Sequence, residues 1–340
     1  MPYRASARAV FLVLVVIWFC LVAASLMMGR YPVTLSHLLA ILMEPAGFSG
    51  SPIPDVERTV IWTVRMPRIL VASLAGGGLA ISGAVLQGVF RNPLVGPHII
   101  GVSTGATVGG ALAILLGLGS MGLLLGAFTF GMLALVLVFA VTRALPRANT
   151  LAVVLAGVVL SGLFGALVSL IQYFADSEEK LPVIVYWLMG SFATANYAKL
   201  TLLAGPVLIF TIVMLMLAWR INILSLGDEE AREIHVNAGA LRWTLLLAVA
   251  AIVSAQVAVS GSIGWVGLVI PHAARMICGP DHRRLLPLSF MMGAIFMVLV
   301  DDVARTVSAS EIPISILTAV IGAPVFLYLL RRSQNRGWNG

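Results

Sequence analysis

The sequence predicts an all-α, polytopic membrane protein, and three features of its composition carry this prediction. Hydrophobic residues make up 60% of the 340 residues, charged residues make up only 10%, and the mean hydropathy is +1.04. Soluble domains carry about 25% charged residues, so most of this chain's surface must face lipid or other apolar protein. These features exclude a soluble enzyme.

Apolar runs long enough to cross a bilayer recur along the whole chain. A hydrocarbon core of about 30 Å needs roughly 20 helical residues per span. We therefore interpret residues 1–340 as a single transmembrane domain with ten spans. Eight clear runs and two less regular ones, in chain order, are 10–28, 69–90, 99–117, 121–141, 151–173, 200–219, 241–260, 263–278, 285–303 and 314–330.

Ten spans place both termini on the same side of the membrane, and the basic residues indicate which side. Fourteen of the 21 lie on the side that holds the termini, against seven on the other. Because cytoplasmic segments are enriched in Lys and Arg, the sequence predicts cytoplasmic termini. The first run could instead be a signal peptide cleaved at Ala23-Ala24-Ser25, but its length exceeds a normal signal-peptide core. Nucleic-acid binding is a weaker explanation of the basic composition, because the arginines form no basic tract.

Small residues recur every four positions on several predicted spans. In lipid, such residues let helix backbones approach closely, so we interpret the repeats as packing stripes. A pore-lining groove is the alternative, and it is strongest for the 151–173 span, because a polar segment follows it at once. The stripes are Ala72, Gly76, Ala80, Ala84 and Gly88; Gly101, Gly105 and Gly109; and Gly157, Ser161, Gly165 and Ser169.

The sequence lacks the residue patterns of catalysis, metal binding and ATP binding. Cys20 and Cys278 form no CxxC pair, and the five histidines are too dispersed for a ligand cluster. Neither lysine follows the GxxxxG of a phosphate-binding loop, and no HExxH or GxSxG is present. We therefore expect no enzyme, no metal site and no bound cofactor. A channel, a scaffold, or the membrane part of a transporter driven by a separate ATPase remain.

The longest predicted cytoplasmic connection, residues 226–239, separates these possibilities. Asp228, Glu229 and Glu230 open it and Gly239 closes it. Acidic residues favour a helix N-terminus, and small residues favour its end. The segment therefore predicts a short amphipathic helix, which is either a solvated surface helix or a contact for a motor protein.

A series of short motifs runs along nearly the whole chain. They are Arg65-Met66-Pro67-Arg68, Ser82-Gly83-Ala84, Gln87, Arg91-Asn92-Pro93-Leu94, Leu226-Gly227 with Ala231-Arg232-Glu233, Gly267-Leu268-Val269-Ile270-Pro271-His272 with Arg275, Asp281-His282-Arg283, Glu311-Ile312-Pro313 and Gly322-Ala323-Pro324. In these motifs the chain resembles the FecCD family, the permease subunits of ABC importers for iron-siderophores, heme and vitamin B12. The resemblance implies a vitamin B12 importer permease-like fold with ten transmembrane helices per subunit.

The resemblance also implies partners and a location. It implies a homodimer in the bacterial inner membrane, two cytoplasmic ABC ATPase subunits that hold ATP and Mg²⁺, and a periplasmic substrate-binding protein. Contact with membrane lipid is expected, and contact with nucleic acid is not.

Three groups of site residues follow from the resemblance. Arg65, Arg68 and Arg305 are expected to dock the binding protein, although Asp301 and Asp302 could instead hold Arg305 on its own helix. Asn149 and Thr150 are expected to gate the path with Asn92 and Leu94, or else only to cap a helix. The residues expected to couple to the ATPase are Gly227, Asp228, Glu230, Ala231, Arg232, Glu233 and Gly239.

The cargo predicted by this resemblance is a metal chelate, namely an iron-siderophore, heme or a corrinoid. The sequence departs from the family pattern at His235, Ser315 and Asp302, and Val95-Gly96 replaces a common Ala followed by an acid. These departures keep a second cargo open, an oxyanion such as molybdate. An ion-coupled carrier or channel is the alternative from another class, but it would need charges at the membrane midplane.

Overall fold

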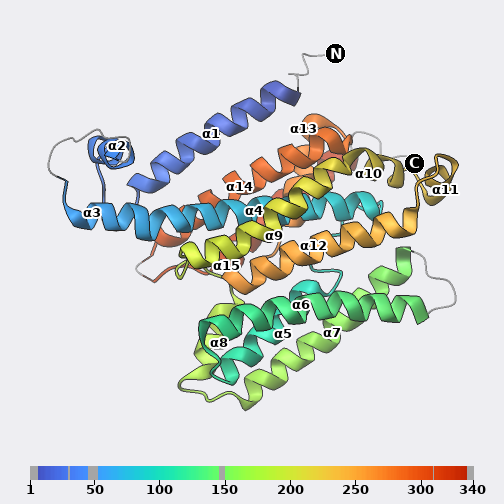
Figure 1. Ribbon diagram of the computed structural model, residues 1–340, viewed down its shortest axis with the longest axis horizontal. Helices are drawn as coiled ribbons and strands as arrows, with labels where there is room; N and C mark the ends of the chain where they lie inside the picture. The colour runs from blue at the N-terminus through green and yellow to red at the C-terminus, as the bar shows by residue number, and fades with distance from the viewer. Residues whose placement is uncertain (1–6, 30, 45–52, 145–149, 309, 335–340) are drawn as a thin grey trace.

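The computed structural model describes residues 7–29, 31–44, 53–144, 150–308 and 310–334, and the regular structure within these ranges is helical. Long helices run roughly side by side along the molecule, and short helices occupy its two ends (Figure 1). The elements are α1 (Ala7–Met27), α2 (Leu35–Met43), α3 (Asp55–Thr59), η2 (Val60–Arg65), α4 (Met66–Val89), α5 (Val102–Leu115), α6 (Gly119–Ala144), α7 (Thr150–Phe174), α8 (Lys180–Leu188), α9 (Tyr197–Met216), α10 (Ala218–Leu224), α11 (Asp228–Glu233), α12 (Ala238–Ser260), α13 (Val266–Cys278), α14 (His282–Thr306) and α15 (Ile314–Gln334).

Each of the ten predicted spans coincides with a helix. Within the described ranges, seven helices are long and apolar enough to cross a membrane, and α5, α13 and α15 are shorter apolar helices. The all-α membrane fold predicted from composition is therefore confirmed.

One span begins well before its predicted start. The sequence indicated a start near residue 69, whereas α3, η2 and α4 form one continuous helix from Asp55 to Val89. Pro67 lacks an N–H donor, and its ring would clash with the carbonyl four residues earlier in a regular helix. The wider π-helical turn η2 lies directly before it. Such a turn interrupts the regular hydrogen bonding, so the helix continues through the proline.

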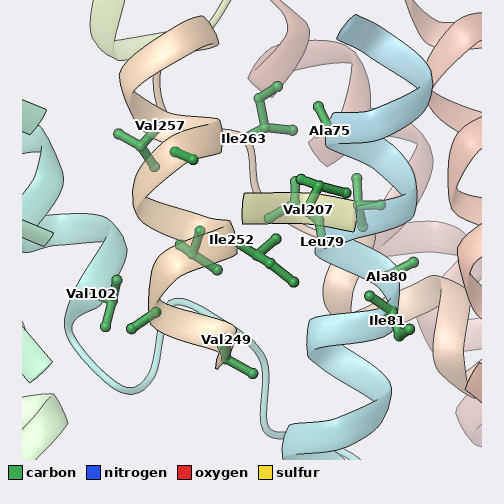
Figure 2. Close-up of a cluster of buried hydrophobic side chains, with 14 of the residues drawn as sticks. Ala75, Leu79, Ala80, Ile81, Val102, Val207, Val249, Ile252, Val257 and Ile263 are labelled. Carbon is green, nitrogen blue, oxygen red and sulfur yellow. The ribbon is translucent and has the colours of Figure 1, made fainter. Parts of the chain in front are cut away.

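The core is built around α4 and α12. In their most apolar segments, 89% of the span containing α4 and 83% of α12 are buried, against 11% of α1. Figure 2 shows Leu79 of α4 and Ile252 of α12 facing each other, with Val207 of α9 beside them. These two helices form the fixed centre of the subunit, and α1 lies at its edge (Figure 1).

The small-residue stripes on α4 and α5 are packing stripes, as predicted. A Cβ on Gly76 would overlap the carbonyl oxygen of Gly293, so α4 and α14 touch backbone to backbone. A Cβ on Gly109 would likewise overlap the carbonyl oxygen of Gly126, which brings α5 against α6. The α7 stripe is divided: a Cβ on Gly157 would overlap the carbonyl oxygen of Ile99, whereas no neighbouring element lies within 4 Å of a Cβ built on Gly165.

Candidate functional site

The predicted coupling segment folds as a short helix, α11, held between α10 and α12. Gly227 precedes it and is buried, and the first helical residue, Asp228, forms an ion pair of 2.8 Å with Arg242 of α12. The side chain of Arg242 is almost buried. The pair therefore fixes α11 to the base of a central helix.

The end of α11 is closed by a Schellman motif whose left-handed residue is His235. The N–H of His235 donates to the carbonyl of Arg232, and the N–H of Val236 donates to the carbonyl of Ala231 at 2.8 Å. These two bonds define the motif, and glycine normally fills its left-handed position. His235 has a φ of 60°. His235 therefore adopts a left-handed backbone conformation, which glycine would adopt without strain.

Two residues assigned to ATPase contact are also engaged within the subunit. Ala231 is fully buried, so its small side chain packs within the subunit. Asp228 is held by Arg242, although its side chain is still 41% exposed. Sequence spacing could not separate the two faces of so short a helix, and the role of both residues in ATPase contact stays a prediction.

The outer face of α11 has acidic and apolar parts. Glu230, Arg232 and Glu233 are exposed, and so is Gly239, which lies in the first turn of α12. Leu226 is 68% exposed and Ile234 is 46% exposed on either side of the helix. Sequence analysis did not assign these two residues to the partner contact. The pattern that could have indicated them is an apolar side chain at each end of an acidic segment.

A polar cluster joins α10 to the start of α14. Asn222 donates from Nδ2 to Asp281 Oδ1 at 2.6 Å and accepts the backbone N–H of His282 at 2.8 Å. Asp281 in turn caps α14 by accepting the N–H of Arg283. Burial tends to raise the pKa of Asp281, but the Asn222 hydrogen bond and the nearby arginines lower the pKa below its ordinary value. Asn222 was also missed, since a lone asparagine after an apolar run carries no signal.

The three arginines assigned to docking are buried. Arg68 is 7% exposed and donates two hydrogen bonds to each of two acids, Asp301 and Glu311. Asp301 accepts along the Nε–Nη2 edge of the guanidinium, with a longer third bond from Nε at 3.2 Å, and Glu311 accepts along the Nη1–Nη2 edge. This pairing joins α4 to α14 and to the turn before α15.

Arg65 and Arg305 lie in the same outer region and are also bonded within the subunit. Arg305 forms an ion pair with Asp302 of its own helix and donates to Ser25 of α1. Arg65 donates to the backbone carbonyls of Leu26 and Tyr31. The pairing of Arg305 on its own helix, open as an alternative from sequence, is observed. The docking role stays a prediction, and it would require acids of the binding protein to replace these internal partners.

Three of the four residues predicted to gate the path, Asn92, Leu94 and Thr150, lie within the described residues. Asn92 follows α4, and its side chain accepts the N–H of Leu94, which is 50% exposed. Arg91 has a φ of 49° and ends α4 in a second Schellman motif, in which the Asn92 N–H donates to the Gln87 carbonyl. Leu94 lines a cavity of about 330 Å³ with Trp265 and other residues of the turn before α13.

The second half of the gate lies elsewhere. Thr150 is the first residue of α7, while Asn149 lies outside the described residues. The structure therefore does not bring Thr150 and Leu94 together within one subunit cavity. Their shared role remains a prediction. In the described ranges, no group of three or more His, Cys, Asp or Glu side chains has an arrangement that could hold a metal ion.

Comparison with known proteins decides the family. The model of the FecCD transport family matches residues 13–332. The chain belongs to the FecCD transport family. It is an ABC transporter permease and an integral membrane protein, and it is not an enzyme, because the ATPase of such transporters is a separate subunit.

Three relatives illustrate the range of the family. The molybdate import system permease protein of Haemophilus influenzae is 50% identical over 315 residues, 93% of each chain. The hemin transport system permease protein of Yersinia pestis is 38% identical, covering 81% of this chain and 84% of its own. A solved inward-facing ABC transporter described as of a metal-chelate type matches with a TM-score of 0.87 and 47% identity, over 96% of this chain and 99% of its own.

Proposed function

We propose that two copies of this FecCD permease form the membrane half of an importer driven by two cytoplasmic ATPase subunits. Cargo arrives on a binding protein at the outer face and passes between the two copies. Support comes from the family match, which covers nearly the whole chain. The α7 face around Gly162 and Gly165 has no neighbour within 4 Å, as a surface that meets a second copy requires.

The proposed orientation places both termini and α11 in the cytoplasm of a bacterial cell, with the subunit in the inner membrane. The excess of arginines on that side supports it. In this orientation the buried cluster of Arg65, Arg68 and Arg305 lies at the outer face, and α11 faces the ATPase.

The proposed cargo is an oxyanion such as molybdate. The observation that carries it is the 50% identity to the molybdate permease across 93% of both chains. The hemin permease of Yersinia pestis and the cobalamin permease of Halobacterium salinarum reach 38% and 40%. A metal chelate is the second candidate, because the structural relative at 47% identity is described as of the metal-chelate type. This order reverses the preference drawn from the sequence.

Energy coupling is proposed to pass through the exposed face of α11. Leu226 and Ile234 provide apolar contact, and the acidic side chains Glu230 and Glu233 set the charge that the ATPase surface must complement. Asn92, Leu94 and Thr150 are proposed to close the path on the cytoplasmic side.

Reconstitution tests the function and the cargo together. The permease would be placed in vesicles with the ATPase and binding protein encoded near it, and uptake of labelled molybdate, ferric siderophore and cobalamin would be compared. We expect ATP-dependent uptake of molybdate, and none with ADP. Uptake of a chelate alone would overturn the oxyanion assignment, and uptake without ATP would overturn the importer.

A further inference from the structure

The first helix leaves the bundle at its N-terminal end and opens a cavity. Near its outer end, α1 is fixed by the Ser25 hydroxyl, which donates to Asp302 at 2.6 Å, and midway by Trp18, which donates to Ser73 at 3.0 Å. Toward Ala7 the helix slants away from the other helices (Figure 1). A cavity of about 990 Å³ lies there between α1 and α14.

The cavity has a basic part and an apolar part. Its arginines come from the first turns of two helices, and its apolar side chains come from the turns that follow them. In the proposed orientation the arginines lie at the cytoplasmic surface, and the apolar residues lie deeper in the membrane. The residues that define the two parts are Arg8, Arg283, Arg284, Phe11, Leu12 and Leu288.

The arginines of this cavity differ from three buried arginines of the bundle. Arg68, Arg242 and Arg305 are buried, and each forms an ion pair with an acid of the same subunit. Arg8, Arg283 and Arg284 are exposed, and no acid in the described ranges forms an ion pair with any of them. Three cations from two helices are therefore available to one external anion.

We propose that this cavity binds the headgroup of an anionic phospholipid from the cytoplasmic leaflet. The arginines hold the phosphate, and the apolar side chains beneath them hold the start of an acyl chain. Basic pockets between membrane helices on the cytoplasmic side have the chemistry for such headgroups. The occupant fills the gap that α1 leaves, and its assignment to the cytoplasmic leaflet rests on the proposed orientation but not on the proposed cargo.

Two other occupants fit the cavity less well. A free phosphate would use the arginines and leave Phe11, Leu12 and Leu288 uncovered. An acidic surface of the ATPase could pair with Arg283 and Arg284, but the exposed acidic and apolar face that suits a protein partner lies on α11, apart from α1 (Figure 1).

Native mass spectrometry of the full-length chain in detergent tests the site. The measurement compares retention of phosphatidylglycerol and of phosphatidylcholine with the same acyl chains. The test variant carries Arg283→Gln and Arg284→Gln. The matched control carries Arg220→Gln and Arg331→Gln, which removes two exposed arginines on the same side of the membrane but outside the cavity.

We expect the unmodified chain to prefer phosphatidylglycerol, the test variant to lose at least about tenfold of that affinity, and the control to stay within about twofold. Millimolar phosphate should not displace the lipid. A second variant, Leu12→Trp, fills the apolar part without changing charge and should also weaken binding.

Several outcomes would overturn the proposal. These are equal retention of both lipids, an equal loss in the control, displacement by phosphate, and an unchanged lipid affinity in a test variant that no longer co-purifies with the ATPase. Each variant must elute like the unmodified chain; should the double arginine variant not do so, Leu12→Trp alone decides.

Discussion

Asn222 on α10 and Asp281 at the start of α14 are joined by a hydrogen bond of 2.6 Å, and the same asparagine accepts the N–H of His282. α10 directly precedes the coupling helix, α11, and α14 packs along the central helix α4. This bond therefore links the segment proposed to contact the ATPase to the core of the permease.

Asn222→Ala should uncouple ATP hydrolysis from transport. It removes the hydrogen bonds of Asn222 to Asp281 and to both the backbone and the ring of His282, and leaves part of the Asp281 cap unsatisfied, at a cost of about 1–3 kcal/mol of stability. Stimulation of the ATPase by the loaded binding protein should fall, while basal hydrolysis stays. The control is Asn196→Ala, which removes a helix cap from α9 at the opposite end. A loss of stimulation in both variants would show that the effect is one of stability alone.

Asp281 should make stability depend on acid pH. Its folded pKa lies below the ordinary value, so its contribution is present above that value, near 3.8, and is lost as the pH falls through the lower folded pKa. Thermal unfolding measured between pH 6 and 3 should therefore show a smaller decline for Asp281→Asn than for the unmodified chain. Parallel curves would contradict this assignment.

His235→Gly should stabilise the chain. A left-handed backbone costs a residue with a Cβ roughly 1 kcal/mol or more, and glycine avoids that cost. We expect a gain of up to about 1 kcal/mol in thermal unfolding, with the ATPase still bound. His235→Ala is the matched control, since it removes the imidazole but keeps the strain. If alanine stabilises as much as glycine, the side chain and not the backbone is responsible.

Ile234→Asp should release the ATPase. It places a charge on the exposed apolar side of α11, which is 46% exposed in the subunit and so tolerates the change in the fold. Co-purification of the ATPase measures the result. Leu118→Asp is the control, because Leu118 is similarly exposed but lies in the turn between α5 and α6, at the end opposite α11. An intact complex with full ATP-driven uptake would rule out the proposed contact.

A double-mutant cycle distinguishes a structural role of Arg68 from a role in docking the binding protein. Arg68→Met leaves Asp301 buried without its partner and should destabilise the chain by about 3–5 kcal/mol. Adding Asp301→Leu should recover most of that loss, since a buried ion pair can often be replaced by apolar residues. If the stable double variant still responds to the loaded binding protein, Arg68 is structural only. If it does not respond, the docking prediction stands.

The helices were predictable because their signal is local. A run of about twenty apolar residues predicts a span whatever that helix packs against. Each predicted span therefore coincides with a helix, and seven of these helices are long and apolar enough to cross a membrane. Burial of the outer arginines was not predictable in this way. Arg68 and Asp301 are 233 positions apart, and only the packing of α4 against α14 brings them together. The same holds for Asn222 and Asp281, whose roles depend on a contact between distant segments.

The coupling helix shows a second limit. Both ends of this helix were predictable from the sequence, because capping depends on residues that are close in sequence. The face of the helix that packs inward was not predictable. Glu230 and Ala231 are adjacent in sequence, yet Glu230 is exposed and Ala231 is buried. A helix of six residues has too few turns for the spacing of its apolar residues to show which face is buried.

The bond between Ser25 and Asp302 has a consequence for how the protein is made. These residues are separated by 277 positions, so α1 leaves the ribosome and enters the membrane long before the helix that fixes its outer end is synthesised. Until α14 arrives, Ser25 has no such acceptor, and α1 has little of its final packing. Biogenesis of this permease therefore includes a late step in which α1, inserted well before α14, is secured only after α14 has been made.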